Sequence, residues 1–340
     1  VLGVGGGIAA YKACELLRRL REAGHDVRVV PTQSALEFVG RATWEALSGN
    51  PVTTTVFDDV HEVAHVRIAQ HAELVVIAPA TANLLAKAAN GLADDLLTST
   101  LLMSRAPVVF APAMHTEMWN HPATQQNVAT LRARGLLVIE PATGRLTGAD
   151  SGQGRLPEPA ALAEVCEAVL DRGTGVADLA GKNVLISAGG TREPLDPVRF
   201  LGNRSSGRQG WALAAAAVAR GAVVQVVAAN VELADPAGAT VVKVGTSEEL
   251  HKAILERASG ADVVVMAAAV ADFRPTEVSV GKIKKTDDQS VPQLELVRTV
   301  DVLAELGANK GEGPLLVGFA AETVVPGPNL LELASAKLAA

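Results

Sequence analysis

The chain has 340 residues and a net charge of −7, and aromatic residues make up only 3% of it. This length is enough for two domains with their own cores, and the acidic charge and few aromatic residues argue against nucleic-acid binding. The sequence has no secretory signal, and no apolar run approaches the length of about 18 residues that a membrane-spanning helix needs. We therefore expect a cytoplasmic protein that does not bind membranes. Cys14 and Cys166 lie in separate halves, which indicates reduced thiols.

The first half alternates predicted strands and helices. Short apolar runs predict strands at residues 1–4, 27–30, 74–78, 108–111 and 136–139. Helical periodicity predicts helices at residues 8–23, 81–89 and 123–134. Strands separated by helical segments are typical of a doubly wound parallel sheet.

The second half repeats this plan after residues 172–181, which read RGTGVADLAG and show no apolar periodicity. We place a linker there, between a first domain of residues 1–171 and a second of residues 182–340. Strands are predicted at 184–188, 223–228, 241–244, 263–267 and 315–319, and helices at 212–220, 248–258 and 302–309. We therefore expect an α/β protein with two tandem doubly wound domains. The helical pattern runs up to Ala340, so we expect the second domain to continue beyond it.

A long polar segment separates the strand predicted at 184–188 from the helix predicted at 212–220. It contains four arginines: Arg192, Arg199, Arg204 and Arg208. Strand-to-helix connections in α/β units are usually about two to six residues long, and open α/β sheets bind ligands at the carboxyl ends of their strands. We expect this segment to bind an anion.

The glycine-rich segment after the first strand allows two interpretations. Gly5, Gly7 and Ala10 fit the G-x-G-x-x-A fingerprint of NAD-binding folds, which also needs an acidic residue at the end of the second strand. Residues 31–34 read PTQS there instead, and hydroxyl groups at a helix N-terminus suit the phosphate of a flavin mononucleotide better. An NAD-dependent oxidoreductase is the less favoured alternative.

Residues 61–65 read HEVAH and match the zinc-binding H-E-x-x-H motif. A zinc site of this type needs a third protein ligand. The segment leads instead directly into a predicted parallel strand, and no further ligand motif follows. The sequence therefore identifies no set of metal ligands.

Longer motifs across the whole chain resemble those of one enzyme family. In the first half, flavin-dependent cysteine decarboxylases have motifs similar to residues 6–12 (GGIAAYK), His65, 78–83 (APATAN), 90–97 (NGLADDLL) and 112–114 (PAM). In the second half, phosphopantothenoylcysteine synthetases have motifs similar to residues 190–199 (GTREPLDPVR), 203–207 (NRSSG), 267–274 (AAAVADFR), 282–285 (KIKK) and 318–323 (GFAAET). The chain thus resembles the bacterial bifunctional coenzyme A biosynthesis proteins, which fuse phosphopantothenoylcysteine decarboxylase to phosphopantothenate–cysteine ligase.

This resemblance implies two consecutive reactions. In the second domain, CTP with Mg²⁺ would activate 4′-phosphopantothenate as an acyl cytidylate, and L-cysteine would displace CMP. In the first domain, FMN would oxidise the cysteinyl thiol so that CO₂ is lost, and the electrons would return to give 4′-phosphopantetheine. The resemblance also implies a homo-oligomer, with trimers of the decarboxylase domain and dimers of the ligase domain that can combine into a dodecamer.

The resemblance further assigns residues to each site. FMN contacts are expected at Gly6, Gly7, Ile8, Thr32, Ser34, Thr81 and Asn83, with His65 as the catalytic histidine. In the second domain, Lys282 matches an essential lysine, Asn203 a residue that handles the acyl cytidylate, and Arg204 and Ser205 are expected to bind substrate. CTP contacts are expected at Met266, Ala267, Ala268, Asp272, Lys282, Asp301, Val302, Leu303, Phe319 and Lys337.

Three positions depart from the family pattern. His115 stands where many relatives have an asparagine that binds the substrate carboxylate, and Gly148 stands where a proton-donating cysteine is usual. Residues 299–303 (TVDVL) replace a common Asn-Pro-Asp motif. We expect His115 to bind substrate and, itself or through water, to supply the proton. A flavoprotein regulatory subunit is the non-enzymatic alternative, and the intact ligase motifs favour the enzyme.

Overall fold

A computed structural model describes residues 1–54, 64–146, 150–173, 177–284, 293–309, 311–321 and 329–339. The chain divides into two compact units. The first contains Val1–Lys182, Trp211–Gln225 and Leu233–Thr240, and the second contains Asn183–Gly210, Val226–Glu232 and Val241–Ala340. Within the described ranges, no helix combines the length and the apolar character needed to cross a membrane.

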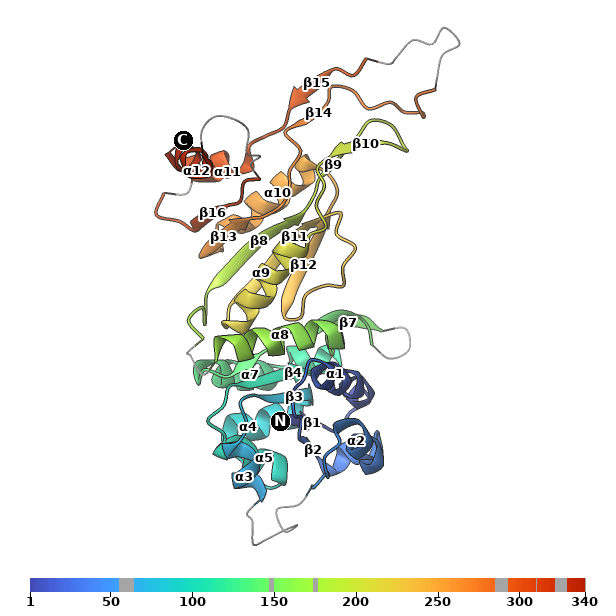
Figure 1. The fold of residues 1–340 in the computed structure, drawn as a ribbon, viewed down its shortest axis with the longest axis vertical. Helices are drawn as coiled ribbons and strands as arrows, with labels where there is room; N and C mark the ends of the chain where they lie inside the picture. Colours follow the sequence, from blue (N-terminus) through green and yellow to red (C-terminus); the bar gives the residue numbers. More distant parts are fainter. Residues whose placement is uncertain are drawn as a thin grey trace. The chain divides into compact units, whose positions relative to one another are not determined.

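The first unit contains a five-stranded parallel sheet with the order β2-β1-β3-β4-β5 (Figure 1). Its strands are β1 (Leu2–Val4), β2 (Val29–Pro31), β3 (Val75–Ala80), β4 (Val108–Pro112) and β5 (Leu137–Val138). Gly3 pairs with Val30 on one side and with Ile77 on the other, so β1 lies inside the sheet. The order reverses direction between β1 and β3, and ligands of doubly wound folds bind at such a point.

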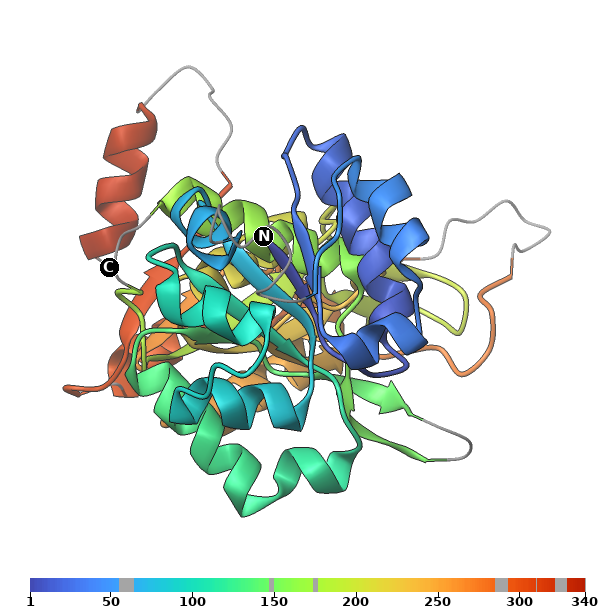
Figure 2. The same ribbon diagram turned by 90° about the horizontal axis from the view of Figure 1, so that it is seen from below.

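Helices cover both faces of this sheet. Figure 2 shows α1 (Ala10–Glu22) and α2 (Arg41–Ser48), in blue, on one side, and α4 (Ala82–Asn90) and α7 (Pro122–Ala133), in cyan to green, on the other. Other helices of this unit are η1 (Gln33–Glu37), α3 (Ala64–Gln70), α5 (Leu96–Met103), α6 (Thr116–Asn120) and α8 (Pro159–Arg172). A short hairpin of β6 (Ala142–Arg145) and β7 (Ser151–Arg155) lies outside the sheet.

The core of the first unit is packed tightly around β3. All six residues of β3 are buried, because helices cover the sheet on both faces. A Cβ atom on Gly3 would lie 2.5 Å from Cδ1 of Ile77 and 2.6 Å from Cδ1 of Leu97, so any larger residue would have to displace these buried side chains. Burying side chains such as Ile77 and Phe110 stabilises the fold by about 1.5–3 kcal/mol each. The strand ends that carry the candidate site therefore start from a rigid base.

A second five-stranded sheet has the order β12-β11-β8-β13-β16. Its strands are β8 (Asn183–Gly189), β11 (Val223–Ala229), β12 (Ala239–Val244), β13 (Val263–Met266) and β16 (Leu315–Gly318). Strand β13 pairs in parallel with both β8 and β16. The helices after Lys182 are α9 (Arg208–Ala219), α10 (Ser247–Ala258), α11 (Val302–Asn309) and α12 (Leu330–Ala339). The two parallel sheets confirm the predicted α/β class.

The polar segment after β8 differs from the predicted loop. It contains an antiparallel hairpin of β9 (Arg192–Pro194) and β10 (Phe200–Gly202), and α9 begins at Arg208 rather than near residue 212. A second hairpin pairs β14 (Phe273–Pro275) with β15 (Leu296–Arg298). Both hairpins escaped prediction because strands of three residues are too short to show a period-two pattern.

Candidate functional site

The residues predicted to hold FMN lie at one edge of the first sheet. They follow the carboxyl ends of β1, β2 and β3: Gly6, Gly7, Ile8, Thr32, Ser34, Thr81 and Asn83. A Cβ atom on Gly6 would lie 2.4 Å from Cβ of Ser34, and one on Gly7 would lie 3.9 Å from Cγ2 of Thr81. The three connections therefore converge at the point where the strand order reverses, although they are separated in the sequence.

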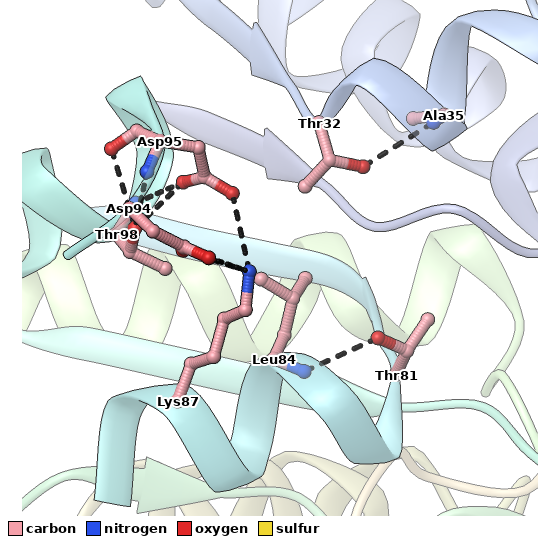
Figure 3. Close-up of polar contacts among 8 residues, drawn as sticks. All are labelled: Thr32, Ala35, Thr81, Leu84, Lys87, Asp94, Asp95 and Thr98. Atoms are coloured by element: carbon pink, nitrogen blue, oxygen red, sulfur yellow. Dashed lines mark hydrogen bonds and ion pairs between the residues drawn. The ribbon is translucent and has the colours of Figure 1, made fainter. Parts of the chain in front are cut away.

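Two threonines cap the helices that begin at this edge (Figure 3). The Thr32 hydroxyl accepts a hydrogen bond from the Ala35 N–H at 3.2 Å, and the Thr81 hydroxyl accepts one from the Leu84 N–H at 3.3 Å. Each cap satisfies one first-turn N–H group, and the others have no partner within the helix. Helix N-termini of this kind bind phosphate groups. The hydroxyls, the amide of Asn83 and these N–H groups form a donor set that fits a phosphate monoester.

The motif at residues 90–97 forms a structural connection beside this edge. Lys87 Nζ donates to Asp94 Oδ1 at 2.7 Å, and it lies 3.9 Å from Asp95 Oδ2 (Figure 3). The Asp95 carboxylate accepts from the Thr98 N–H at 2.8 Å and closes a capping box at the start of α5. The hydrogen bond from Lys87 lowers the pKa of Asp94. Lys87 is thus engaged by these two carboxylates.

A cavity of about 390 Å³ lies beside Gly7 and Ile8 and contains His115 in its wall. The β6–β7 hairpin closes another side of this cavity, because the Met114 N–H donates to the Gly154 carbonyl at 2.9 Å and the Thr116 hydroxyl donates to the Gln153 carbonyl at 2.8 Å. The close approach of β7 to Met114 requires glycine at position 154, where φ is 155° and a Cβ atom would lie 2.1 Å from the Met114 carbonyl oxygen. His115 is therefore held beside the edge that carries the predicted FMN contacts, by a hairpin that was not predicted from the sequence.

Basic side chains line the same cavity. Lys12, Arg145 and Arg155 are among its lining residues. Lys12 binds the Glu158 carboxylate at 2.9 Å, and Arg155 binds the same oxygen at 3.1 Å. The excess of cations over carboxylates in this wall suits an anionic substrate.

Two expected residues of the first site fall partly or wholly outside the described part of the chain. His65 belongs to α3, but the position of its side chain is not described. Residues 61–63 of the zinc-like motif lie outside the described ranges. Gly148 also lies outside the described ranges. Among the residues that are described, no group of three or more His, Cys, Asp or Glu side chains could hold a metal ion.

In the second unit, a cavity of about 530 Å³ lies at the ends of β13 and β16. It brings together most of the residues predicted to contact CTP: Met266, Ala268, Asp272, Asp301, Val302, Leu303 and Phe319. Ala267 and Lys282 are not among its lining residues, and Lys337 belongs to α12 with its side chain undescribed. Its size is within the range of about 300–1,000 Å³ that small-molecule sites occupy.

Two further residues line this cavity: Arg298, which was not predicted, and Thr299, which the sequence marked only as the start of the 299–303 segment. Hairpin β14–β15 pairs Arg298 with Phe273 and so brings the 267–274 motif beside residues 298–303. The Thr299 hydroxyl donates to the Ala271 carbonyl at 2.6 Å. Asp301 is the N-cap of α11, because its carboxylate accepts from the Ala304 N–H at 3.0 Å. Arg298 could have been predicted only from the antiparallel pairing of β14 with β15, and the local sequence does not show that pairing.

The arginines of the polar segment are only partly available to a ligand. Arg192 stacks over the ring of Phe200 at 4.9 Å, and Arg199 binds the Asp196 carboxylate through Nε at 2.9 Å. Both side chains therefore also stabilise the β9–β10 hairpin, and their role as anion donors stays a prediction. Asn203 donates from Nδ2 to the Val270 carbonyl at 2.9 Å. This bond ties Asn203, and with it the neighbouring Arg204 and Ser205, to the edge of the second cavity.

Comparisons with known proteins agree with this architecture. Residues 1–171 match the family described as "Flavoprotein", and residues 179–340 match the "DNA/pantothenate metabolism flavoprotein C-terminal domain". These two matches define the chain as a two-domain flavoprotein of the pantothenate metabolism class. The chain belongs to the family of bifunctional coenzyme A biosynthesis proteins, as the following relatives show.

The chain is 59% identical to "Coenzyme A biosynthesis bifunctional protein CoaBC" of Mycolicibacterium smegmatis, over 99% of this chain and 83% of that protein. It is 42% identical to the protein of the same name from Vibrio vulnificus, over 95% of this chain and 80% of that protein. Among solved structures, a PPC decarboxylase mutant complexed with pantothenoylaminoethenethiol is 31% identical and covers 50% of this chain and 96% of its own, with a TM-score of 0.46.

Proposed function

We propose that the chain catalyses two consecutive steps of coenzyme A biosynthesis. The second unit joins 4′-phosphopantothenate to L-cysteine with CTP, and the first unit decarboxylates the product with FMN to give 4′-phosphopantetheine. One observation carries the proposal: the expected FMN contacts share one sheet edge, and most expected CTP contacts line one cavity. Membership of the bifunctional family favours these activities over an NAD-dependent oxidoreductase.

The first unit supports the FMN-dependent step through its donors and its neighbouring cavity. Thr32, Ser34, Thr81 and Asn83, with the first-turn N–H groups, would hold the FMN phosphate. FMN, when bound, supplies the two-electron oxidation and the later reduction that this decarboxylation needs. The cavity beside Gly7 and Ile8 would place the substrate against the flavin site.

Within that cavity, this chain's residues would bind the substrate and move a proton. Lys12, Arg145 and Arg155 would attract the anionic substrate. His115 lines the same wall and is suited to proton transfer near neutral pH, so we assign it the protonation of the substrate carbon after CO₂ is lost. We assign His65 the acid–base or orienting role in the oxidative half of the reaction.

The second unit supports nucleotide chemistry through its cavity. Joining a carboxylate to the α-phosphate of CTP brings two anions together, so a cation must stabilise the transition state. Arg298 lines the cavity, and we assign Lys282 the same electrostatic role in cytidylate formation. The exposed Asp272 carboxylate, together with the CTP phosphates, would suit Mg²⁺, which binds through carboxylates and substrate phosphates. Asn203 would then stabilise the oxyanion that forms when cysteine attacks.

The proposal includes the assembly and the compartment. We propose a homo-oligomer with trimeric decarboxylase and dimeric ligase contacts, which analytical ultracentrifugation of the purified protein would measure. Cys14 and Cys166 are free thiols, which fits the reducing cytoplasm.

A coupled assay tests both activities in one preparation. The purified protein should show the visible absorption of bound flavin. With 4′-phosphopantothenate, L-cysteine, CTP and Mg²⁺ it should release pyrophosphate and CO₂ in equal amounts, and omitting CTP should stop both. A yellow protein that releases neither product would instead favour the flavoprotein regulatory subunit, and a colourless protein that binds NAD would favour the oxidoreductase.

A further inference from the structure

A buried carboxylate lies at the turn of the β9–β10 hairpin. The Asp196 side chain has 0% of its surface exposed. Its Oδ1 accepts from the N–H groups of Val198 and Arg199, both at 2.8 Å, and its Oδ2 accepts from Nε of Arg199 at 2.9 Å. Burial alone raises the pKa of this carboxyl, but the hydrogen bonds from Arg199 and the backbone outweigh it and hold the pKa well below its usual range. Asp196 is therefore ionised at neutral pH.

The Asp196–Arg199 pair also grips a segment that is distant in the sequence. The Ile283 N–H donates to Asp196 Oδ2 at 3.1 Å, and Arg199 Nη2 donates to the Ile283 carbonyl at 2.7 Å. A third bond runs from the Ser279 N–H to the Leu195 carbonyl at 3.0 Å. Both polar backbone groups of Ile283 are thus held by one ion pair, and Ile283 follows Lys282 directly.

We propose that Asp196 is a positioning residue that fixes the backbone beside Lys282, so that the lysine can stabilise formation of the acyl cytidylate. This inference rests on the proposed ligase function. Lys282 is exposed, and its long side chain carries several rotatable bonds, so its position depends on a fixed backbone. Asp196 supplies the fixed point because its carboxylate is inaccessible to water and saturated with donors.

An Asp196→Asn substitution tests whether the hydrogen bonds of the Asp196 carboxylate matter, rather than the volume of its side chain. It has nearly the same volume as aspartate, but only one of its two terminal groups accepts hydrogen bonds. If its NH₂ group replaced Oδ2, it would face Nε and Nη2 of Arg199 and the Ile283 N–H. If it replaced Oδ1, it would face the N–H groups of Val198 and Arg199. In the first orientation three donors meet a donor, and the bond from the Ile283 N–H is lost. In the second, two donors meet a donor in the turn that carries Arg199, and the ion pair with Arg199 is lost in both cases, so the grip on Ile283 is lost or weakened.

Glu193 offers a matched control on the same hairpin. It is also buried, at 2% exposure, but its carboxylate accepts from the Ser247 N–H at 2.9 Å, at the start of α10. Glu193→Gln keeps an oxygen acceptor for that bond. Since Glu193 binds α10 rather than Ile283, this variant should change the hairpin without releasing Lys282.

The test combines hydrogen exchange with kinetics in the full chain. Exchange would be followed by mass spectrometry with fragmentation that resolves single amides. In the unmodified protein, the Ile283 amide should exchange at least about tenfold more slowly than the Lys284 amide. Asp196→Asn should remove this protection and slow pyrophosphate release about tenfold to a hundredfold through kcat, because a misplacement of about 1 Å can cost that much. The KM for CTP and all values for Glu193→Gln should stay within about twofold.

Each other outcome has a defined meaning. Normal pyrophosphate release by Asp196→Asn, or an unprotected Ile283 amide in the unmodified protein, overturns the proposal. If circular dichroism shows that Asp196→Asn does not fold, Arg199→Gln decides. It removes the ion pair with Asp196 and the bond to the Ile283 carbonyl from a half-exposed side chain, but it leaves the Asp196 carboxylate in place, and it should weaken the protection of the Ile283 amide. If the unmodified protein releases no pyrophosphate, the proposed ligase function fails, while the exchange result still reports on the tether itself.

Discussion

Replacing Gly6 by alanine should weaken FMN binding by a measurable amount. The added Cβ would lie 2.4 Å from Cβ of Ser34, and ordinary van der Waals contact begins near 3.4 Å, so the two connections must move apart by about 1 Å. An N–H···O bond of about 2.9 Å does not survive that displacement. Losing one or two hydrogen bonds to a charged phosphate, at about 1.5–3 kcal/mol each, should raise the Kd for FMN about tenfold or more.

Gly40→Ala is the matched control for this change. Gly40 also precedes a helix, but a Cβ atom there meets nothing within 4 Å. The measurement is titration of the flavin-free proteins with FMN, followed by quenching of flavin fluorescence. Gly40→Ala should bind like the unmodified protein. An unchanged Kd for Gly6→Ala, in a variant with normal thermal stability, would refute the assignment of this edge to the FMN phosphate.

Three further predictions concern the chemical steps. His65→Asn should keep FMN and ligation but abolish CO₂ release, and loss of bound zinc from this variant would show that the zinc interpretation was correct. His115→Ala should slow the reductive half-reaction more than flavin reduction in stopped-flow traces, and equal slowing of both would indicate a positioning role only. Lys282→Gln should stop pyrophosphate release, whereas Asn203→Asp should still release it and accumulate the 4′-phosphopantothenoyl cytidylate, because losing one oxyanion donor costs about a hundredfold to a thousandfold in rate. Mass spectrometry of quenched single-turnover mixtures distinguishes the last two variants, and the reverse pattern would contradict both roles.

The buried parallel strands could be predicted because they are short, continuous apolar runs. Strand β3 is buried throughout and was visible in the sequence at residues 74–78. The prediction ended two residues early, because Pro79 and Ala80 do not look like strand residues although they lie in β3. Predicted helices likewise agree with α1, α7 and α10 to within a few residues.

Long-range polar contacts could not be predicted from the sequence. Asp196 and Ile283 are separated by 87 positions, and their contact depends on the turn of a hairpin whose strands have three residues each. Arg298 reaches the second cavity only through antiparallel pairing with Phe273. Local patterns carry no information on such pairings, and it was the family resemblance that named most of the candidate residues around both cavities.

Three buried residues of the 190–199 motif hold other segments of the fold in place. As whole residues, Thr191, Glu193 and Asp196 are 0%, 2% and 3% exposed. The side chain of each accepts a hydrogen bond from a backbone N–H of a different segment: Ala271, Ser247 and Ile283. Each of these bonds joins two segments of the fold, so a relative that had lost ligase activity would still gain stability from the three residues. Their presence alone therefore does not distinguish an active enzyme from an inactive one. Exposed cavity residues that the fold does not require, such as Asp272 and Phe319, are better markers for that purpose.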